Sequence, residues 1–206
     1  SSPVQIGTLA TWSAIAAGTS HSLAVKTDST LWSWGSGANG RLGDNATLNK
    51  SSPAQVGTLA TWKTVYAALS HSFAIKTDST IWSWGLGTSG QTGDDQAASR
   101  SSPTQIGTLA DWTFVAPQLL SSHGLGVRSG VLYAWGSGLR GQLGNNYNGL
   151  AISPVQIGTL VTWSSVKALG NVLALKTDST LWAWGGNAVG HIVDRFVVSR
   201  SSPVQV

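Results

Sequence analysis

The stretch His21–Asn45, HSLAVKTDSTLWSWGSGANGRLGDN, returns three more times in the chain, and this repetition constrains the fold more than any other feature. The later copies begin at His71, His123 and Asn171. A single repeat of this kind cannot bury its apolar face alone, so copies at a fixed spacing predict units that pack against one another. A spacing of about 50 residues is typical of propeller blades or solenoid turns.

The whole chain, residues 1–206, divides into four repeats and a short final segment. We place the repeats at 1–50, 51–100, 101–151 and 152–200, and the segment 201–206 repeats the first strand of each unit. Because repeats of this length are architectural pieces rather than domains, we predict one continuous array of four blades.

Each repeat contains four candidate strands, which in the first repeat are 3–6, 13–17, 21–26 and 31–34. Side chains alternate between the two faces of a strand, so Trp32 and Trp34 share a face. The polar turn Thr27–Thr30 joins the last two strands as a hairpin, with Asp28 supplying hydrogen bonds to the backbone. No segment shows sustained helical periodicity. The sequence therefore predicts an all-β propeller of four-stranded blades.

Composition narrows the functional classes. Only 10% of the residues are charged, there is no Glu and no Cys, and the net charge is +4. The basic residues are scattered rather than clustered, so we do not expect nucleic acid to be the partner. No apolar run is long enough to span a membrane.

The motif Trp-Gly-x-x-x-x-Gly-x-Leu-Gly occurs at 34–43 and 135–144, and Gly-x-x-His-Ser-Leu-Ala-Val precedes the first copy at 18–25. This pattern resembles the repeat of the regulator of chromosome condensation family over essentially the whole chain. The resemblance implies a propeller, usually of seven blades. Four blades leave three arrangements open: an arc of a larger propeller, which we favour, an unusual closure, or an association of copies.

Residues that recur at equivalent places are expected to be structural, because a catalytic centre occurs once whereas a structural role repeats. These repeat positions are His21, His71, His123, Trp34, Trp84, Trp135 and Trp184. The acidic residues lack the clustered spacing of a calcium loop, and no serine lies in a nucleophile-elbow context. We expect no metal, no cofactor and no enzymatic activity.

Repeats three and four depart from the pattern, and a specialised surface is expected there. Asn171 replaces the repeated histidine, and the last glycine loop has diverged. Exposed loop aromatics and basic residues are the candidate interaction surface, since interface anchors are often aromatic. These candidates are Tyr147, Phe196, Arg140, Arg195 and His191. The repeated lysines, Lys26, Lys76 and Lys176, are expected to project from one edge of the blades as a basic rim.

We interpret the chain as a non-enzymatic binding or structural propeller, extracellular or on a virion surface, as in a fibre or adhesin. A protein or glycan partner would bind the loop rims, and the end blades would self-associate or pack against further blades. Two alternatives come from the resemblance: guanine-nucleotide exchange on a small GTPase, and inhibition of a protein. No blade carries an insertion long enough to serve as the wedge of the exchange factors.

Overall fold

The computed structural model describes residues 2, 5–6, 11–116, 122–168, 170–190, 192 and 197–206. Sixteen strands and one short 3₁₀ turn, Ala38–Gly40, make up the regular structure of this part. The strands are β1 (Trp12–Ala17), β2 (His21–Lys26), β3 (Thr30–Gly35), β4 (Lys50–Ala60), β5 (Trp62–Ala67), β6 (His71–Lys76), β7 (Ile81–Gly85), β8 (Arg100–Gln105), β9 (Trp112–Ala116), β10 (His123–Arg128), β11 (Val131–Ser137), β12 (Leu150–Gln156), β13 (Trp163–Ala168), β14 (Asn171–Lys176), β15 (Leu181–Gly185) and β16 (Arg200–Gln205).

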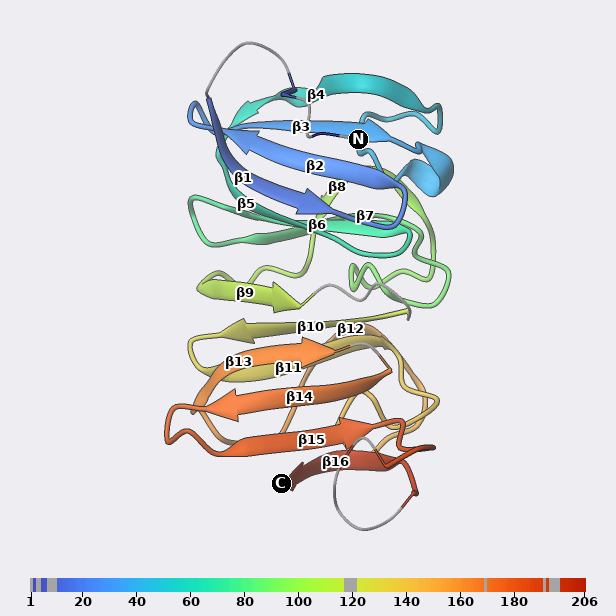
Figure 1. The fold of residues 1–206 in the computed structure, drawn as a ribbon, viewed down its shortest axis with the longest axis vertical. Coiled ribbons are helices and arrows are strands. Elements are labelled where there is room, and N and C mark those ends of the chain that lie inside the picture. The colour runs from blue at the N-terminus through green and yellow to red at the C-terminus, as the bar shows by residue number, and fades with distance from the viewer. Residues whose placement is uncertain are drawn as a thin grey trace.

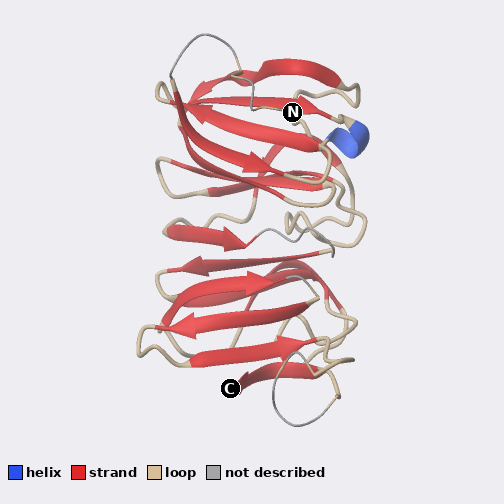
Figure 2. Ribbon diagram, in the orientation of Figure 1, coloured by secondary structure: helices blue, strands red, loops and turns tan. Residues whose placement is uncertain are grey.

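The strands form four antiparallel sheets of four strands each, which confirms the predicted all-β fold of four blades. The sheets are β1–β4, β5–β8, β9–β12 and β13–β16, in chain order. Figure 1 shows them stacked one after another along the long axis, with the first and fourth sheets at opposite ends. Almost all of the described part of the chain is strand and loop (Figure 2).

The sheets are offset from the sequence repeats. The Ser-Pro strand that opens the second, third and fourth repeats pairs as the outer strand of the preceding sheet: β4, for example, begins at Lys50 and pairs with β3. Consecutive strands tend to be neighbours, and this strand follows β3 in the chain, so it completes that sheet. The final segment 201–206 therefore completes the fourth sheet, as part of β16. The first predicted strand, 3–6, lies mostly outside the described residues.

The hairpin between the two central strands has the predicted acidic turn. Asp28 Oδ1 accepts hydrogen bonds from the Thr30 amide at 3.0 Å and the Thr30 hydroxyl at 2.6 Å. Thr30 Oγ1 in turn accepts the indole N–H of Trp32 at 2.9 Å. The same bonds recur in the second and fourth sheets. A short polar side chain at this place thus closes the turn and orients the following tryptophan.

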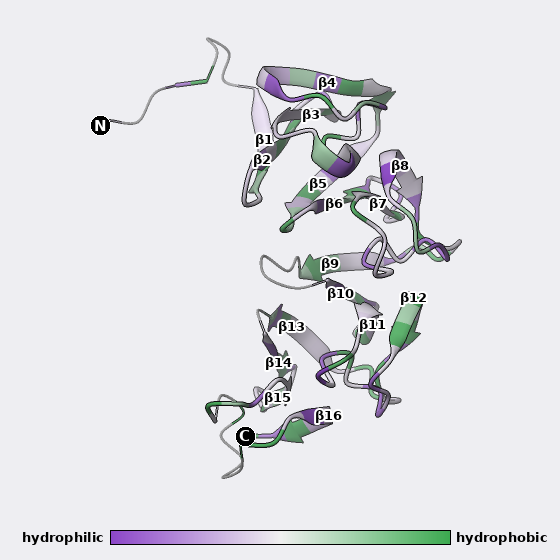
Figure 3. Ribbon diagram, turned by 90° about the vertical axis from the view of Figure 1, so that its right-hand side faces the viewer, coloured by the Kyte–Doolittle hydropathy of each residue, from purple (hydrophilic) through white to green (hydrophobic). Residues whose placement is uncertain are grey.

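The hydrophobic core consists of three clusters, one between each pair of neighbouring sheets. In the first, Leu23 and Leu31 of the first sheet are buried with Trp62, Val65 and Trp84 of the second. Equivalent residues form the other two clusters. Figure 3 shows the sheets after a turn of 90°. The first strands of the third and fourth sheets, β9 and β13, lie toward one side of the molecule, and the last strands of the second and third sheets, β8 and β12, lie toward the other. The fold is thus a row of sheets whose stability depends on repeated sheet-to-sheet packing.

Candidate functional site

The second tryptophan of the second, third and fourth sheets fixes the loop of the sheet before it. Trp84 Nε1 donates to the carbonyl oxygen of Arg41 at 2.9 Å, and its indole lies against Gly43. A Cβ at Gly43 would come within 2.8 Å of that indole, and the backbone there has a φ of +77°. Trp135 and Trp184 make the same bond to Gln91 and Gln142. The Trp-Gly…Gly-x-Leu-Gly motif therefore attaches the loop of one sheet to the tryptophan of the next.

The next residues of the same loop pair with the outer strand of the following sheet. The amide of Asn146 donates to the Ser201 carbonyl at 2.7 Å, and Asn45 does the same to Ser101 at 2.8 Å. Both asparagines have a φ of +61°, a conformation that asparagine adopts more readily than most residues. Each loop thus forms one wall of a groove whose other wall is the next sheet.

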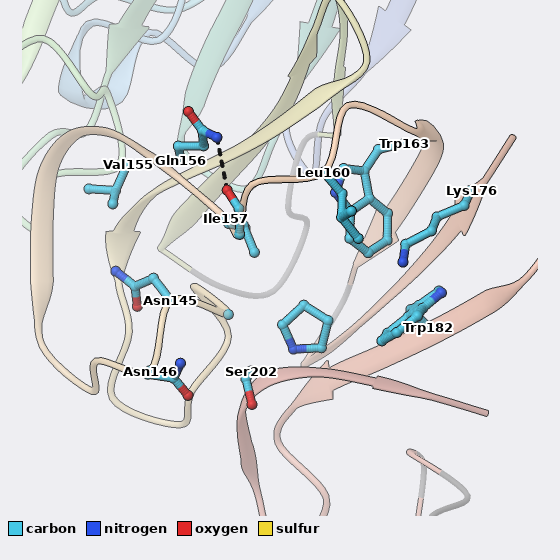
Figure 4. A pocket seen from close by; sticks show the side chains of 13 residues that line it. Asn145, Asn146, Val155, Gln156, Ile157, Leu160, Trp163, Lys176, Trp182 and Ser202 are labelled. Atoms are coloured by element: carbon cyan, nitrogen blue, oxygen red, sulfur yellow. Dashed lines mark hydrogen bonds between the residues drawn. The ribbon is translucent and has the colours of Figure 1, made fainter.

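The groove between the third and fourth sheets has a volume of about 370 Å³. Figure 4 shows Asn145 and Asn146 on one side of it and the rings of Trp163 and Trp182 on the other. The remaining lining side chains are Val155, Gln156, Ile157, Leu160, Lys176, Ser202 and Pro203. The groove therefore combines apolar rings with amide groups that can both donate and accept hydrogen bonds.

A lysine lies on the aromatic wall. Lys176 Nζ is 3.6 Å from the ring centroid of Trp182 and 5.1 Å from that of Trp163, and the lysine is 7% exposed. Such cation–π contact stabilises an ammonium that is partly removed from water. Lys76 lies in the same way over Trp82, at 3.6 Å, and burial lowers its pKa. The expected basic rim of repeated lysines is therefore wrong, since their side chains lie along indole faces rather than projecting from the edge.

The first and second sheets form a counterpart groove of about 250 Å³, lined by Asn45, Leu59, Trp62, Trp82 and Pro103 among others. One difference changes its chemistry. Asp44 stands where the other groove has Asn145, and its carboxylate lies 3.4 Å from Lys50 Nζ. The groove between the third and fourth sheets carries amides instead and is the larger of the two. This departure from the repeat singles it out as the candidate site.

The structure describes two of the five residues predicted as an interaction surface. Tyr147 is 59% exposed, and its amide donates to Asn145 Oδ1 at 3.1 Å, so it lies beside the groove wall. Arg140 is exposed in the same loop, between β11 and β12. Phe196, Arg195 and His191 lie outside the described residues.

Sequence reasoning missed the residues that line the groove. Asn145, Gln156 and Trp182 occupy ordinary repeat positions, and only their side chains and their place between two sheets distinguish them. The available signal was the change from Asp44 to Asn145 at equivalent places in two loops.

The repeated histidines are buried between sheets. His21 Nε2 lies 2.9 Å from the Ser72 hydroxyl of the second sheet, which itself donates to the Arg41 carbonyl at 2.9 Å. Because the single hydroxyl proton is used there, His21 Nε2 is the donor to Ser72. Burial, with the nearby Arg41 charge, lowers the pKa of His21 to about 4. Burial lowers that of His71 to about 3 and that of His123 to about 4, so all three are neutral at pH 7.

No three His, Asp or similar ligands in the described ranges gather closely enough to hold a metal ion. Within the same ranges, no helix has the length and apolarity that a membrane span requires.

Two profiles of the regulator of chromosome condensation (RCC1) repeat match the chain, over residues 28–75 and 12–41. Solved structures extend the likeness to nearly the whole chain. Prp20p of Saccharomyces cerevisiae superposes with a TM-score of 0.85 at 21% identity, covering 99% of this chain and 52% of its own. Human WBSCR16 gives 0.78 at 21% identity, covering 95% and 52%.

Prp20p is described as binding Gsp1p and histones. Yeast RCC1 (Prp20) bound to Kap60 matches with a TM-score of 0.74 at 23% identity, covering 93% of this chain and 48% of its own. This chain spans about half the length of these proteins. At such identities the likeness establishes the fold, and the binding properties belong to the relatives.

Proposed function

Because the chain carries repeats of the regulator of chromosome condensation family, we propose that it is a non-enzymatic, protein-binding propeller. Its partner presents a peptide segment to the groove between the third and fourth sheets. The observation that carries the proposal is the groove itself, which departs from its counterpart at Asn145. Prp20p, which has this fold, binds proteins, and this supports a protein partner over other classes.

The groove suits an extended peptide. Trp182, Pro203 and Leu160 offer an apolar surface, and Leu160 is 47% exposed and thus available for contact. The amides of Asn145 and Asn146 can pair with the N–H and C=O groups of a peptide backbone. Since the carboxylate of the counterpart groove is replaced by an amide, the site places no fixed negative charge against the ligand.

We place the protein outside a cell or on a virion surface, as part of a fibre or adhesin. Support comes from composition: few charges, no Cys and abundant Ser, Thr and Gly, which suit a durable surface protein. The location is tested with an antibody to the chain, applied to intact cells or particles. Labelling only after permeabilisation would contradict it. Self-association concerns the end sheets and is a separate contact from this groove.

The binding test uses a phage-displayed library of linear peptides, selected on the immobilised chain. Selected peptides are then measured against wild type, Asn145→Asp and Asp44→Asn. The first variant retains the local hydrogen bond, because a carboxylate accepts the Tyr147 amide as Asp44 accepts the Ala46 amide at 3.2 Å. We expect Asn145→Asp to weaken binding by about threefold to tenfold, the loss of one net hydrogen bond. Asp44→Asn should leave binding unchanged.

Equal affinity for the wild type and Asn145→Asp would show that the peptides bind elsewhere. Failure to select any peptide, together with recognition of oligosaccharides on a glycan array, would replace the protein partner with the glycan partner that the sequence left open.

A further inference from the structure

Among the residues that the structure describes, the two end sheets have uncovered apolar surfaces, and these are the two halves of the interface that the chain builds three times in its interior. We define the leading flank as Trp12, Ile15, Ala17 and Trp34 of the first sheet. We define the trailing flank as Leu173, Leu175 and Leu181 of the fourth sheet. We propose that a second copy of this chain covers both flanks by packing head to tail.

The leading flank is open where its interior equivalents are closed. Ile15 is 79% exposed, whereas the same position is 3% exposed at Val65, 0% at Val115 and 1% at Val166. Trp34 is half-buried, while its equivalents, such as Trp84, are completely buried. A hollow of about 240 Å³ lies on this flank, lined by Trp12, Ile15 and Trp34 of the first sheet and by Ile6 of the N-terminal segment, among others.

The trailing flank is likewise exposed where its interior equivalents are buried. Leu173, Leu175 and Leu181 are 40%, 42% and 37% exposed. The corresponding residues of the first sheet, Leu23, Val25 and Leu31, are 1% exposed or less, because the second sheet covers them. The second and third sheets bury the same three positions in their own clusters.

Complementarity follows from the repeat itself. In the first cluster the trailing residues Leu23 and Leu31 pack on Trp62, Val65 and Trp84, the leading residues of the next sheet. The open trailing leucines are the same residue types as Leu23 and Leu31, and the open leading residues match Trp62, Val65 and Trp84 with Ile in place of Val. One chain therefore carries both surfaces of an interface already shown to pack.

The two flanks of one chain lie at opposite ends of the long axis (Figure 1), so one copy does not cover itself. A head-to-tail contact uses two different surfaces, and it gives either a closed ring or an open filament. Since each copy contributes four sheets, two copies close a ring of eight sheets with two identical interfaces. Eight blades lie within the range of known propellers.

The test is the mass of the 206-residue chain, measured by sedimentation velocity over a concentration series, for wild type, Ile15→Asp, Leu173→Asp and the control Leu48→Asp. Leu48 is 72% exposed and lies on neither flank. We expect twice the mass of one chain for wild type and for the control. Each flank variant should be a single chain, because either substitution damages both interfaces of the ring.

Mixing the two flank variants is the decisive step. Ile15→Asp retains an intact trailing flank and Leu173→Asp an intact leading flank, so the mixture should regain a species of twice the mass. This recovery also shows that both variants fold. A wild type that stays a single chain up to millimolar concentration would overturn the proposal, as would a Leu173→Asp variant that still dimerises. A mass that grows without limit would overturn the closed ring.

Discussion

Substituting alanine at two equivalent glycines separates the contribution of sheet packing to stability from that of backbone conformation. Gly40 and Gly190 occupy the same place in the first and fourth repeats, with φ of +77° and +79°. A Cβ at Gly40 would lie 2.5 Å from the Cα of Ser101 and 2.6 Å from the carbonyl oxygen of Arg100, both in the next sheet. A Cβ at Gly190 would meet no atom of the described residues within 4 Å.

The magnitudes follow from these distances. Alanine in a left-handed conformation costs about 1–2 kcal/mol, offset by about 0.4–1 kcal/mol from the stiffer unfolded chain. Both variants lose this net amount of roughly 1 kcal/mol. Gly40→Ala additionally forces backbone atoms of two sheets apart, which as overpacking costs about 1–3 kcal/mol more.

The assay is urea unfolding followed by far-UV circular dichroism, with both variants and wild type at the same low concentration. We expect Gly40→Ala to lower the midpoint clearly more than Gly190→Ala. Equal losses would refute the reasoning, because they would mean that the close approach between sheets contributes nothing to stability.

Two further predictions concern the buried polar groups. Since burial holds the pKa of the three histidines at about 3 to 4, against about 6.5 when unfolded, the unfolded chain takes up protons first as the pH falls. Stability is thus retained above pH 6.5 and lost between about pH 6.5 and 4, by about 1.4 kcal/mol per histidine per pH unit. His71→Asn, which copies Asn171 of the fourth repeat, should reduce this slope by about a third in urea titrations at several pH values. Trp84→Phe, which removes the bond to Arg41 and part of a buried ring, should cost about 2–4 kcal/mol, and Trp34→Phe about 1 kcal/mol or less, in the same unfolding assay. Equal costs for the two tryptophans would contradict the docking role of the indole.

The strands and hairpins could be predicted from local sequence because their determinants are local. The alternation in His21–Lys26 and the acidic turn at Asp28 specify a hairpin without reference to the rest of the chain. The partner of the Ser-Ser-Pro strand was not fixed in this way. Closely similar strands flank each repeat on both sides, and the connection from β3 to β4 decides which sheet gains the strand.

The exposure of a side chain and the chemistry of a site depend on which sheets lie beside it in the array. A motif that is the same in every repeat does not predict this. Ile15 and Val65 occupy the same motif position, yet Ile15 is open and Val65 is buried, because within the described residues the first sheet packs on Val65 and no sheet packs on Ile15. From the sequence alone, Lys176 is expected to be a solvated charge. In the structure its ammonium lies over Trp182, because the hairpin brings their strands together. The groove beside it exists only between two packed sheets, so no single repeat predicts it.

Thiol accessibility tests most directly the claim that three interior interfaces are closed and two equivalent flanks are open. The chain has no native Cys, so one introduced thiol reports one position. In dilute solution, where copies are separate, Ile15→Cys and Leu173→Cys should react with a thiol reagent as exposed groups do, while Val65→Cys and Leu23→Cys react only through unfolding. A Val65→Cys thiol that reacts as fast as Ile15→Cys, or an Ile15→Cys thiol protected in dilute solution, would contradict the account.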